Sequence, residues 1–350
     1  MKAEVKNHTE TSINKVAMGS IPFYSIGVTT YNRLEMLKQN ITSIINQTFE
    51  DFEVIIGNDY PYEQISPNLL GINDPRIRFV NNVTNLGEIA NMNSLLRISR
   101  GKYFTWLGDD DAYAPCFLGT AYDAICNHDF PLVAFSSFVS GPEYTGYTVD
   151  DAPSKIRVST GRHFLREYLS RSVKVIGCYG LFNTEYLRSN GGIEKLGNGF
   201  SPYADNLLAI RSGLLDSLIY IDTPLIFFRT HQDSMSYTSP DLDAYQSAQK
   251  ELLPKSMEIF RDERLKDDFN DNLFFILKWC IMDIDSVIRR SGSVRIKQIS
   301  DYFHFLQRYV AQLKGSTFYG RTLRLIMRTA LLLLRDVGRN RIIIRFTSIT

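Results

Sequence analysis

Asp109, Asp110 and Asp111 are the residues of this 350-residue sequence whose type and spacing most directly suggest chemistry. Three adjacent carboxylates repel one another, and the repulsion costs stability unless a cation offsets it. Mg²⁺ and Mn²⁺ prefer carboxylate oxygens and usually take one or two of them together with phosphate oxygens. The triplet by itself therefore predicts either a divalent-metal site or a solvated acidic turn, because Asp is also common at turns and helix ends.

The elements that must position the triplet alternate between strand and helix. Buried β-branched or aromatic runs predict strands, and apolar residues three and four positions apart predict helices. The predicted strands are residues 23–30, 52–57, 76–80 and 102–107, and the predicted helices are residues 34–47 and 86–99. This alternation predicts a parallel sheet with helices on both faces, whose ligands bind beyond the carboxyl ends of the strands. Asn32, Asp59 and the aspartate triplet each follow a predicted strand, so we expect them to gather at one edge of the sheet.

The chain divides into a tail, an α/β region and a helical region. The predicted boundaries are residues 1–21 for the flexible tail, 22–240 for the α/β region and 241–350 for the helical region. The tail is polar and has no periodicity. The α/β region is expected to divide into halves at 22–115 and 116–240.

The composition argues against several classes of protein. A hydrophobic content of 44% and a charged content of 22% are ordinary for a soluble globular chain. The formal net charge of +1 provides no field that would attract nucleic acid. The four cysteines form no CxxC pair, which disfavours a zinc knuckle and favours buried, reduced thiols. We find no signal-peptide run and no stretch of about 18 uninterrupted apolar residues, so we expect a cytoplasmic protein.

Four motifs occur in order along the first half. They are Val28–Arg33 (VTTYNR), Ser43–Asp59 (SIINQTFEDFEVIIGND), Asn85–Tyr103 with its NLG and RGKY pieces, and Leu107–Pro115 (LGDDDAYAP). In this order they resemble the TYNR-type turn, the SIxxQTxxxxEIIVVDD block, the NxGxxxARNxGxxxAxGxY run and the LDxDDxxxP motif of family 2 glycosyltransferases. Each is weak alone, but their common register over about ninety residues is specific. The resemblance implies an α/β, GT-A (Rossmann-like) fold with a mixed, mainly parallel sheet. It also implies that residues 22–115 bind the donor and residues 116–240 the acceptor.

The resemblance also implies roles for the matching residues on the donor side. The expected nucleotide-sugar contacts are Thr30, Tyr31, Arg33, Asp59, Asn85, Asn91 and Asp109. Tyr31 and Asp59 resemble the residues that hold the base, with Asp59 accepting from the ring N–H. Asp109 and Asp110 resemble the pair that meets the ribose and the diphosphate-bound Mn²⁺ or Mg²⁺. Asp111 is then either a further metal ligand or a partner of one.

Two shorter segments extend the resemblance into the second half. Tyr203–Arg211 (YADNLLAIR) resembles an EDxxLxxR segment, which implies that Asp205 is the general base. Asp205 also opens a predicted helix, where a carboxylate can act as a cap. Phe227–Ser236 (FFRTHQDSMS) resembles a YRxHxxSxS segment, which implies that His231 is a metal ligand or a diphosphate contact. The alternative for His231 is a polar surface loop.

The leading interpretation is an inverting, metal-assisted glycosyltransferase. It would move a sugar from a nucleotide diphosphate sugar, expected to be a UDP-sugar, to a glycan or lipid-linked acceptor in polysaccharide biosynthesis. Inversion comes from the resemblance alone. A nucleotidyltransferase should carry a Gly-rich basic loop after the first strand, where this chain has Thr-Thr-Tyr-Asn-Arg. A degenerate homologue that binds nucleotide or a partner without turnover is the other alternative, because Gly108 and Ala204 stand where the family often has acidic residues.

The segment 321–345 is both basic and apolar. Its arginines alternate with runs of leucine and isoleucine, a composition that can lie on an anionic membrane surface. The alternative is a helix that packs on the catalytic domain with its arginines in solvent. Arg328 and Arg335 bracket a run too short to span a bilayer. The peripheral alternative would place the protein on the inner face of the membrane.

Overall fold

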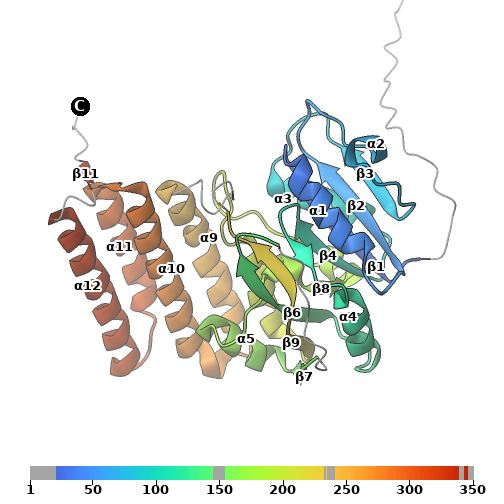
Figure 1. Ribbon diagram of the computed structural model, residues 1–350. Coiled ribbons are helices and arrows are strands. Elements are labelled where there is room, and N and C mark those ends of the chain that lie inside the picture. The colour runs from blue at the N-terminus through green and yellow to red at the C-terminus, as the bar shows by residue number, and fades with distance from the viewer. Residues whose placement is uncertain (1–20, 145–153, 232–233, 235–240, 339–342, 346–350) are drawn as a thin grey trace, which may run out of the picture.

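The computed structural model describes residues 21–144, 154–231, 234, 241–338 and 343–345 (Figure 1). The predicted tail, part of the loop at 140–160 and the segment that follows His231 therefore lie largely outside the described residues. So do Arg339 and Arg341 of the basic segment.

Parallel strands form the first half of the central sheet. β1 (Tyr24–Thr30), β2 (Phe52–Asn58), β3 (Ile77–Asn81) and β4 (Tyr103–Gly108) pair in parallel in the order β3-β2-β1-β4. Helix α1 (Leu34–Ile45) buries its apolar residues against one face, and α3 (Glu88–Ile98) buries its own against the other. The short helix α2 (Pro67–Leu70) lies between β2 and β3 in sequence. The alternation predicted from the sequence is confirmed in this half.

The second half makes the sheet mixed. The sheet continues from β4 in the order β8-β6-β9-β5, with β7 also paired to β9. The strands are β5 (Ala112–Tyr113), β6 (Val133–Gly141), β7 (Ile156–Ser159), β8 (Leu181–Asn183) and β9 (Leu218–Arg229). The α-helices are α4 (Phe117–Cys126), α5 (Gly161–Ser170), α6 (Thr184–Ser189) and α7 (Ala204–Arg211), and the 3₁₀ turns are η1 (Gly177–Tyr179) and η2 (Ser212–Leu214). β6 and β9 are parallel, whereas β8, β5 and β7 run antiparallel to their neighbours.

A helical region follows the sheet. It contains α9 (Leu242–Phe260), η3 (Lys266–Asp268), α10 (Phe269–Ser291), α11 (Ile296–Val310) and α12 (Ser316–Gly338), with β10 (Ser293–Arg295) pairing β11 (Ile343–Arg345). Figure 1 shows these helices side by side, with α9 nearest the sheet. α9 packs on α7, and α10 packs on α5. One apolar core runs without a break from Trp106 of β4 to Leu306 of α11, so the helical region is attached to the α/β region by packing.

Three local features differ from the sequence expectation or add to it. α3 begins at Glu88 rather than at residue 86, and both Leu86 (45% exposed) and Ile98 (36% exposed) lie outside its buried stripe. The cause is the carboxylate of Asp59, which binds the N–H groups of Leu86 and Gly87 and keeps them out of the helix. The four cysteines are free thiols, of which only Cys280 is fully buried. Among the described helices, none is both long and apolar enough to cross a bilayer.

Candidate active site

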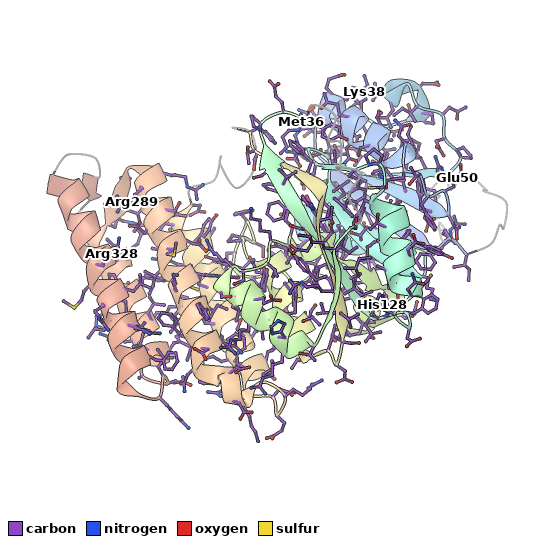
Figure 2. All side chains as sticks on the ribbon, turned by 60° about the horizontal axis from the view of Figure 1, so that its bottom comes forward. Met36, Lys38, Glu50, His128, Arg289 and Arg328 are labelled. Carbon is purple, nitrogen blue, oxygen red and sulfur yellow. The ribbon has the colours of Figure 1, made fainter. Side chains whose placement is uncertain are left out.

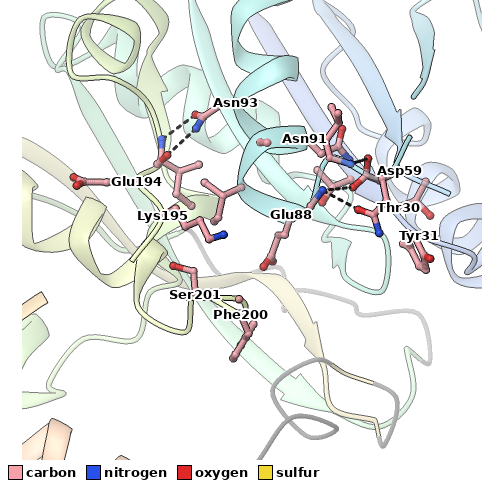
Figure 3. A pocket seen from close by; sticks show the side chains of 18 of the residues that line it. Thr30, Tyr31, Asp59, Glu88, Asn91, Asn93, Glu194, Lys195, Phe200 and Ser201 are labelled. Atoms are coloured by element: carbon pink, nitrogen blue, oxygen red, sulfur yellow. Dashed lines mark hydrogen bonds between the residues drawn. The ribbon is translucent and has the colours of Figure 1, made fainter. Parts of the chain in front are cut away.

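A cavity of about 1130 Å³ lies beyond the carboxyl ends of β1 and β2 (Figure 3). Its wall combines the turn after β1, the end of β2, the start of α3 and the segment 190–201. Six of the expected donor contacts lie in this wall: Thr30, Tyr31, Arg33, Asp59, Asn85 and Asn91. The edge of the sheet predicted to bind ligand is thus a cavity of the size that holds a nucleotide-sized ligand.

Asp59 shapes this cavity by holding the loop that precedes α3. One oxygen accepts from the N–H of Leu86 and from Asn82 Nδ2, at 2.8 and 3.0 Å, and the other accepts from the N–H of Gly87 at 2.8 Å. Gly87 has φ +83°, a conformation that side chains rarely adopt. Asn85 caps the same N–H of Gly87 at 2.8 Å. The Asp59 carboxylate is buried in the cavity wall and fixed there by three donors.

Asn91 has a comparable role one turn into α3. Its side-chain amide donates to the carbonyl of Gly57 at 2.8 Å, which ties α3 to β2. A Cβ at Gly57 would lie 2.5 Å from Asn91 Oδ1 and 2.9 Å from Leu95, so only glycine permits this close approach.

Asp109 lies behind the cavity wall and is fully buried. Arg33 binds its two oxygens, with Nη2 to Oδ1 at 2.6 Å and Nε to Oδ2 at 3.3 Å. Thr30 and the backbone of Tyr31 also donate to it. Burial raises the pKa of Asp109 to about 6, and this effect outweighs the attraction of Arg33. Asp109 therefore holds the turn after β1 and the guanidinium of Arg33, which itself faces the cavity.

Asp110 and His231 come together although they are far apart in the sequence. His231 Nε2 lies 2.9 Å from Asp110 Oδ2, and Arg33 Nη1 lies 2.9 Å from the same oxygen. The side chains of Asp110 and His231 are 16% and 13% exposed, so both still reach solvent. His231 Nδ1 is buried and has no hydrogen-bond partner among the described residues.

Asp111 points away from Asp110. Its Oδ1 accepts from the N–H of Arg229 at 2.7 Å, and its Oδ2 accepts a short hydrogen bond from the hydroxyl of Tyr179. The side chain is fully buried, and burial raises its pKa well above the usual range. Of the two roles that the resemblance left open for Asp111, this geometry favours a partner that fixes the loop over a metal ligand.

Gly108 fits this arrangement, whereas a larger residue would require the side chains of Asp110 and Tyr179 to shift. A Cβ at this position would lie 2.8 Å from Asp110 Oδ1 and 2.9 Å from the hydroxyl of Tyr179. A similar constraint applies at Ala204, which is 3% exposed and packs in the apolar core, where an acidic side chain would lose its hydration. Both departures from the family pattern therefore have local packing reasons.

The donor set available to a divalent cation is small. In the part of the chain that the structure describes, no group of three or more His, Cys, Asp or Glu side chains is arranged to hold a metal ion. Asp110 and His231 supply one carboxylate and one imidazole that converge on one point. Mg²⁺ and Mn²⁺ sites at phosphates commonly use one or two protein ligands with phosphate oxygens and water. The pair therefore fits a cation that a bound diphosphate helps to hold.

Asp205 lies in the first turn of α7. Its carboxylate accepts from the N–H groups of Asn206 and Gly177, yet burial still raises its pKa to about 6. Gly177 approaches the residue so closely that a Cβ would lie 1.8 Å from the Asp205 carbonyl oxygen. A carboxylate with this pKa is mostly ionised at neutral pH and is a better proton acceptor than an ordinary aspartate.

Glu88 is a site residue that the sequence reasoning missed. It opens α3 and points into the cavity with Lys195 and Ser201 (Figure 3). The side chain is exposed to the cavity, and the loss of hydration beside the protein raises its pKa to about 7, with the charges of Asp205 and Asp110 adding to the rise. Both of those carboxylates therefore lie near Glu88. Acidic residues are common at helix N-termini because they interact favourably with the helix dipole, so nothing in the sequence indicated that Glu88 belongs to the site.

Comparisons with known proteins agree with this architecture. Residues 25–189 match the family described as glycosyl transferase family 2. The chain is 33% identical over 100 residues to WcaA of Escherichia coli K12, whose name assigns it to colanic acid biosynthesis as a glycosyl transferase; the match covers 28% of this chain and 36% of WcaA. It is 34% identical over 94 residues to the GalNAc(5)-diNAcBac-PP-undecaprenol β-1,3-glucosyltransferase of Campylobacter jejuni, covering 26% of this chain and 30% of that protein. The matched part spans about a third of the length of these relatives.

A solved structure is similar over nearly the whole chain. Residues 1–349 of S. aureus TarS, in complex with UDP-GlcNAc, superpose with a TM-score of 0.58 at 15% identity, covering 91% of this chain and 89% of that one. The likeness at this identity is one of fold, and it includes the helical region as well as the sheet. The fold is therefore that of the GT-A glycosyltransferases, and residues 25–189 match the model of glycosyl transferase family 2.

Proposed function

We propose that the protein is an inverting glycosyltransferase that moves a sugar from a nucleotide diphosphate sugar to a glycan or lipid-linked acceptor in polysaccharide biosynthesis. One observation carries the proposal. A single cavity has the expected base-side residues in one part of its wall, and Glu88, in the same wall, feels the charges of both Asp110 and Asp205. Arg33, which lines the cavity, also binds Asp110 at 2.9 Å, so we infer that a donor bound there would place its diphosphate near Asp110 and its sugar toward Asp205.

We assign the donor as a UDP-sugar. Tyr31, half exposed at the rim, and Asp59, fixed in the wall, would hold the base. Arg33 and Lys195 supply positive charge in the same cavity, as a diphosphate requires. The complex of S. aureus TarS with UDP-GlcNAc supports the choice of UDP, since that protein shares the fold.

Asp205 would act as the base in a single displacement. The acceptor hydroxyl loses its proton to the Asp205 carboxylate while its oxygen bonds to the anomeric carbon. The bond from that carbon to the diphosphate oxygen breaks, and the nucleoside diphosphate leaves with the bonding electrons. One displacement of this kind inverts the anomeric configuration. Arg33 would orient the diphosphate through its fixed contacts with Asp109 and Asp110.

Asp110 and His231 would hold Mn²⁺ or Mg²⁺ together with the diphosphate. When bound, such a cation offsets the negative charge that develops on the leaving group. In the cation-free geometry, the guanidinium of Arg33 partly neutralises Asp110. Binding of the cation would then release His231 Nε2 from its contact with Asp110.

We further propose a peripheral membrane contact through the helical region. A groove of about 290 Å³ between α10 and α12 is lined by four cationic side chains, Lys278, Arg321, Arg324 and Arg328, beside Phe274 and Leu325. Figure 2 shows Arg328 on α12, the helix farthest from the sheet. Basic side chains beside apolar ones suit an anionic lipid surface. Such a contact would bring the enzyme to a lipid-linked acceptor.

The test is binding and hydrolysis of a panel of nucleotide sugars, with and without Mn²⁺, by the wild-type protein and by Asp110→Asn. We expect metal-dependent turnover of one donor and a loss of about 10²-fold or more in the variant. Asp123→Asn, the same change at an exposed position of α4, is the matched control and should behave as wild type. If no donor binds with any metal, the degenerate homologue becomes the better account and the proposal fails.

A further inference from the structure

A second cavity, of about 850 Å³, lies where the α/β region meets the helical region. Four aromatic rings from four different elements converge on it: Tyr168 of α5, Tyr203 before α7, Tyr245 of α9 and Trp279 of α10. We call these rings, with Arg171, Asn206 and Asp283, the aromatic pocket. We propose that the aromatic pocket binds a saccharide unit of the acceptor, next to the unit that reacts, so that the acceptor is an oligosaccharide or longer. This inference rests on the proposed function.

The rings are packed as a rigid surface. Tyr168 and Trp279 meet edge to face with their centroids 5.2 Å apart, and Tyr203 and Tyr245 do the same at 5.9 Å. Three of the four rings carry a hydroxyl and the fourth an indole N–H, so each combines an apolar body with a polar group. A sugar presents the same combination of C–H surface and hydroxyls. A site for a purely apolar ligand would not need this many polar groups.

Polar side chains at the wall are held in place by this surface. The hydroxyl of Tyr203 donates to Asp283 Oδ2 at 3.0 Å and accepts from Gln249 Nε2 at 2.7 Å. Asn206 Nδ2 donates to the hydroxyl of Tyr168 at 2.7 Å. Carboxylate and carboxamide groups have more acceptor capacity than these bonds use, and two oxygens in a plane suit neighbouring hydroxyls of a sugar. The network therefore preorganises Asp283 and Asn206 without requiring a ligand.

Arg171, at the rim of the aromatic pocket, has an unusual backbone conformation. It ends α5 with φ +64°, a left-handed conformation that is uncommon for residues other than glycine. In this conformation its guanidinium lies 5.3 Å from the centre of the Trp279 ring. The backbone thus holds an exposed cation over the largest ring of the pocket, where it can close over a bound sugar or meet an anionic substituent on it.

The position of the aromatic pocket relative to Asp205 assigns its ligand to the acceptor. The segment 200–206 separates the two cavities: Phe200 and Ser201 line the donor cavity, whereas Tyr203 and Asn206 line the aromatic pocket. Asp205 lies within this segment, in the first turn of α7, directly before Asn206, which lines the aromatic pocket. A saccharide in the aromatic pocket therefore lies on the side of the base away from the donor. A saccharide bound in the aromatic pocket can therefore reach Asp205 only through a further sugar unit, which would be the unit that reacts.

The test uses an array of defined bacterial oligosaccharides and their constituent monosaccharides, probed with the full-length protein. Trp279→Phe and Arg171→Ala are the test variants, and Arg166→Ala, the same change at an exposed position of α5, is the matched control. UDP-sugar binding is measured in parallel on every variant. We expect wild type and the control to bind a set of oligosaccharides and not the matching monosaccharides. Both test variants should lose at least tenfold in this affinity while their UDP-sugar binding is unchanged.

A second readout is the tryptophan emission, because the chain has two tryptophans and Trp106 is buried in β4. A glycan from the array should shift the emission of wild type and not that of Trp279→Phe. The inference is overturned if both test variants keep full glycan affinity, or if a protein that binds UDP-sugar binds no oligosaccharide. Glycan binding that depends on Trp279 in a protein that binds no nucleotide sugar would support the pocket and contradict the proposed function instead.

Discussion

Replacing the candidate base by its neutral isostere, Asp205→Asn, should make the protein more stable and less active at once. The folded state encloses Asp205 and raises its pKa to about 6, from an ordinary value of 3.8. The folded protein therefore binds this proton more tightly than the unfolded chain does. Above pH 6 the carboxylate is ionised in both states, and its burial destabilises the folded one.

The size of the effect follows from the shift. A difference of about 2 pKa units corresponds to about 3 kcal/mol at 1.36 kcal/mol per unit. Below pH 3.8 both states are protonated and this penalty is absent. The amide cannot ionise, but its Nδ2 group is a donor, so only one oxygen is left to accept from the N–H groups of Gly177 and Asn206. We therefore expect a gain of about 1–3 kcal/mol for the variant at pH 8, which vanishes near pH 4.

Two assays test this reasoning. Urea unfolding of wild type and variant at pH 4 and pH 8 measures the difference in the free energy of unfolding. Sugar transfer from pH 5 to pH 8 should rise in the wild type with a midpoint near 6, whereas the variant should lose about 10²- to 10⁴-fold at its maximum. A variant that is less stable than wild type at pH 8, or that transfers sugar at the wild-type rate, would refute the assignment.

Three further substitutions address positions that surround the site. Gly177→Ala should cost about 3 kcal/mol or more in urea unfolding, because its Cβ would lie 1.8 Å from the Asp205 carbonyl oxygen; a variant within about 0.5 kcal/mol of wild type would show that this approach is not tight. Asp111→Ala should cost about 2–4 kcal/mol in metal-free buffer, since it leaves a buried N–H and a buried hydroxyl without an acceptor. A loss of stability seen only with Mn²⁺ would instead mark Asp111 as a ligand. The double variant Arg324→Ser/Arg328→Ser should bind phosphatidylglycerol vesicles about 30-fold more weakly at low salt, at about 1 kcal/mol per arginine. Equal sedimentation of variant and wild type with these vesicles, with phosphatidylcholine vesicles as the blank, would argue against the membrane contact.

The strands and the first helices were predictable because their signals are local. β2 is buried at every position and contains the apolar, β-branched run Val54–Ile56, and α1 repeats its apolar residues at helical spacing. Parallel strands end at one edge by topology, so the sequence was enough to predict that Asn32, Asp59 and the aspartate triplet would lie near one another. The matching motifs added the roles, which remain proposals.

The contacts across the chain could not be predicted in this way. Nothing in the sequence indicates that Asp110 and Asp111 turn in opposite directions, since that depends on contacts from Tyr179 of η1 and Arg229 of β9. The loss of hydration that raises the pKa of Glu88 is likewise a product of packing. The bounds and direction of the antiparallel strand β8 could not be predicted, because its three residues are too few to show a period.

The sequence by itself determined the α/β class, the edge of the sheet where ligands bind and the residue types available there. The reason is that strand burial and helix periodicity depend on residues that are close in the sequence. Only the tertiary structure decided which carboxylate faces the cavity, which one is held in the core, and that α9 and α10 close a second pocket against Tyr168 and Tyr203. The physical reason is that pKa shifts, buried hydrogen bonds and cavities depend on atoms that are distant in the chain and near in space.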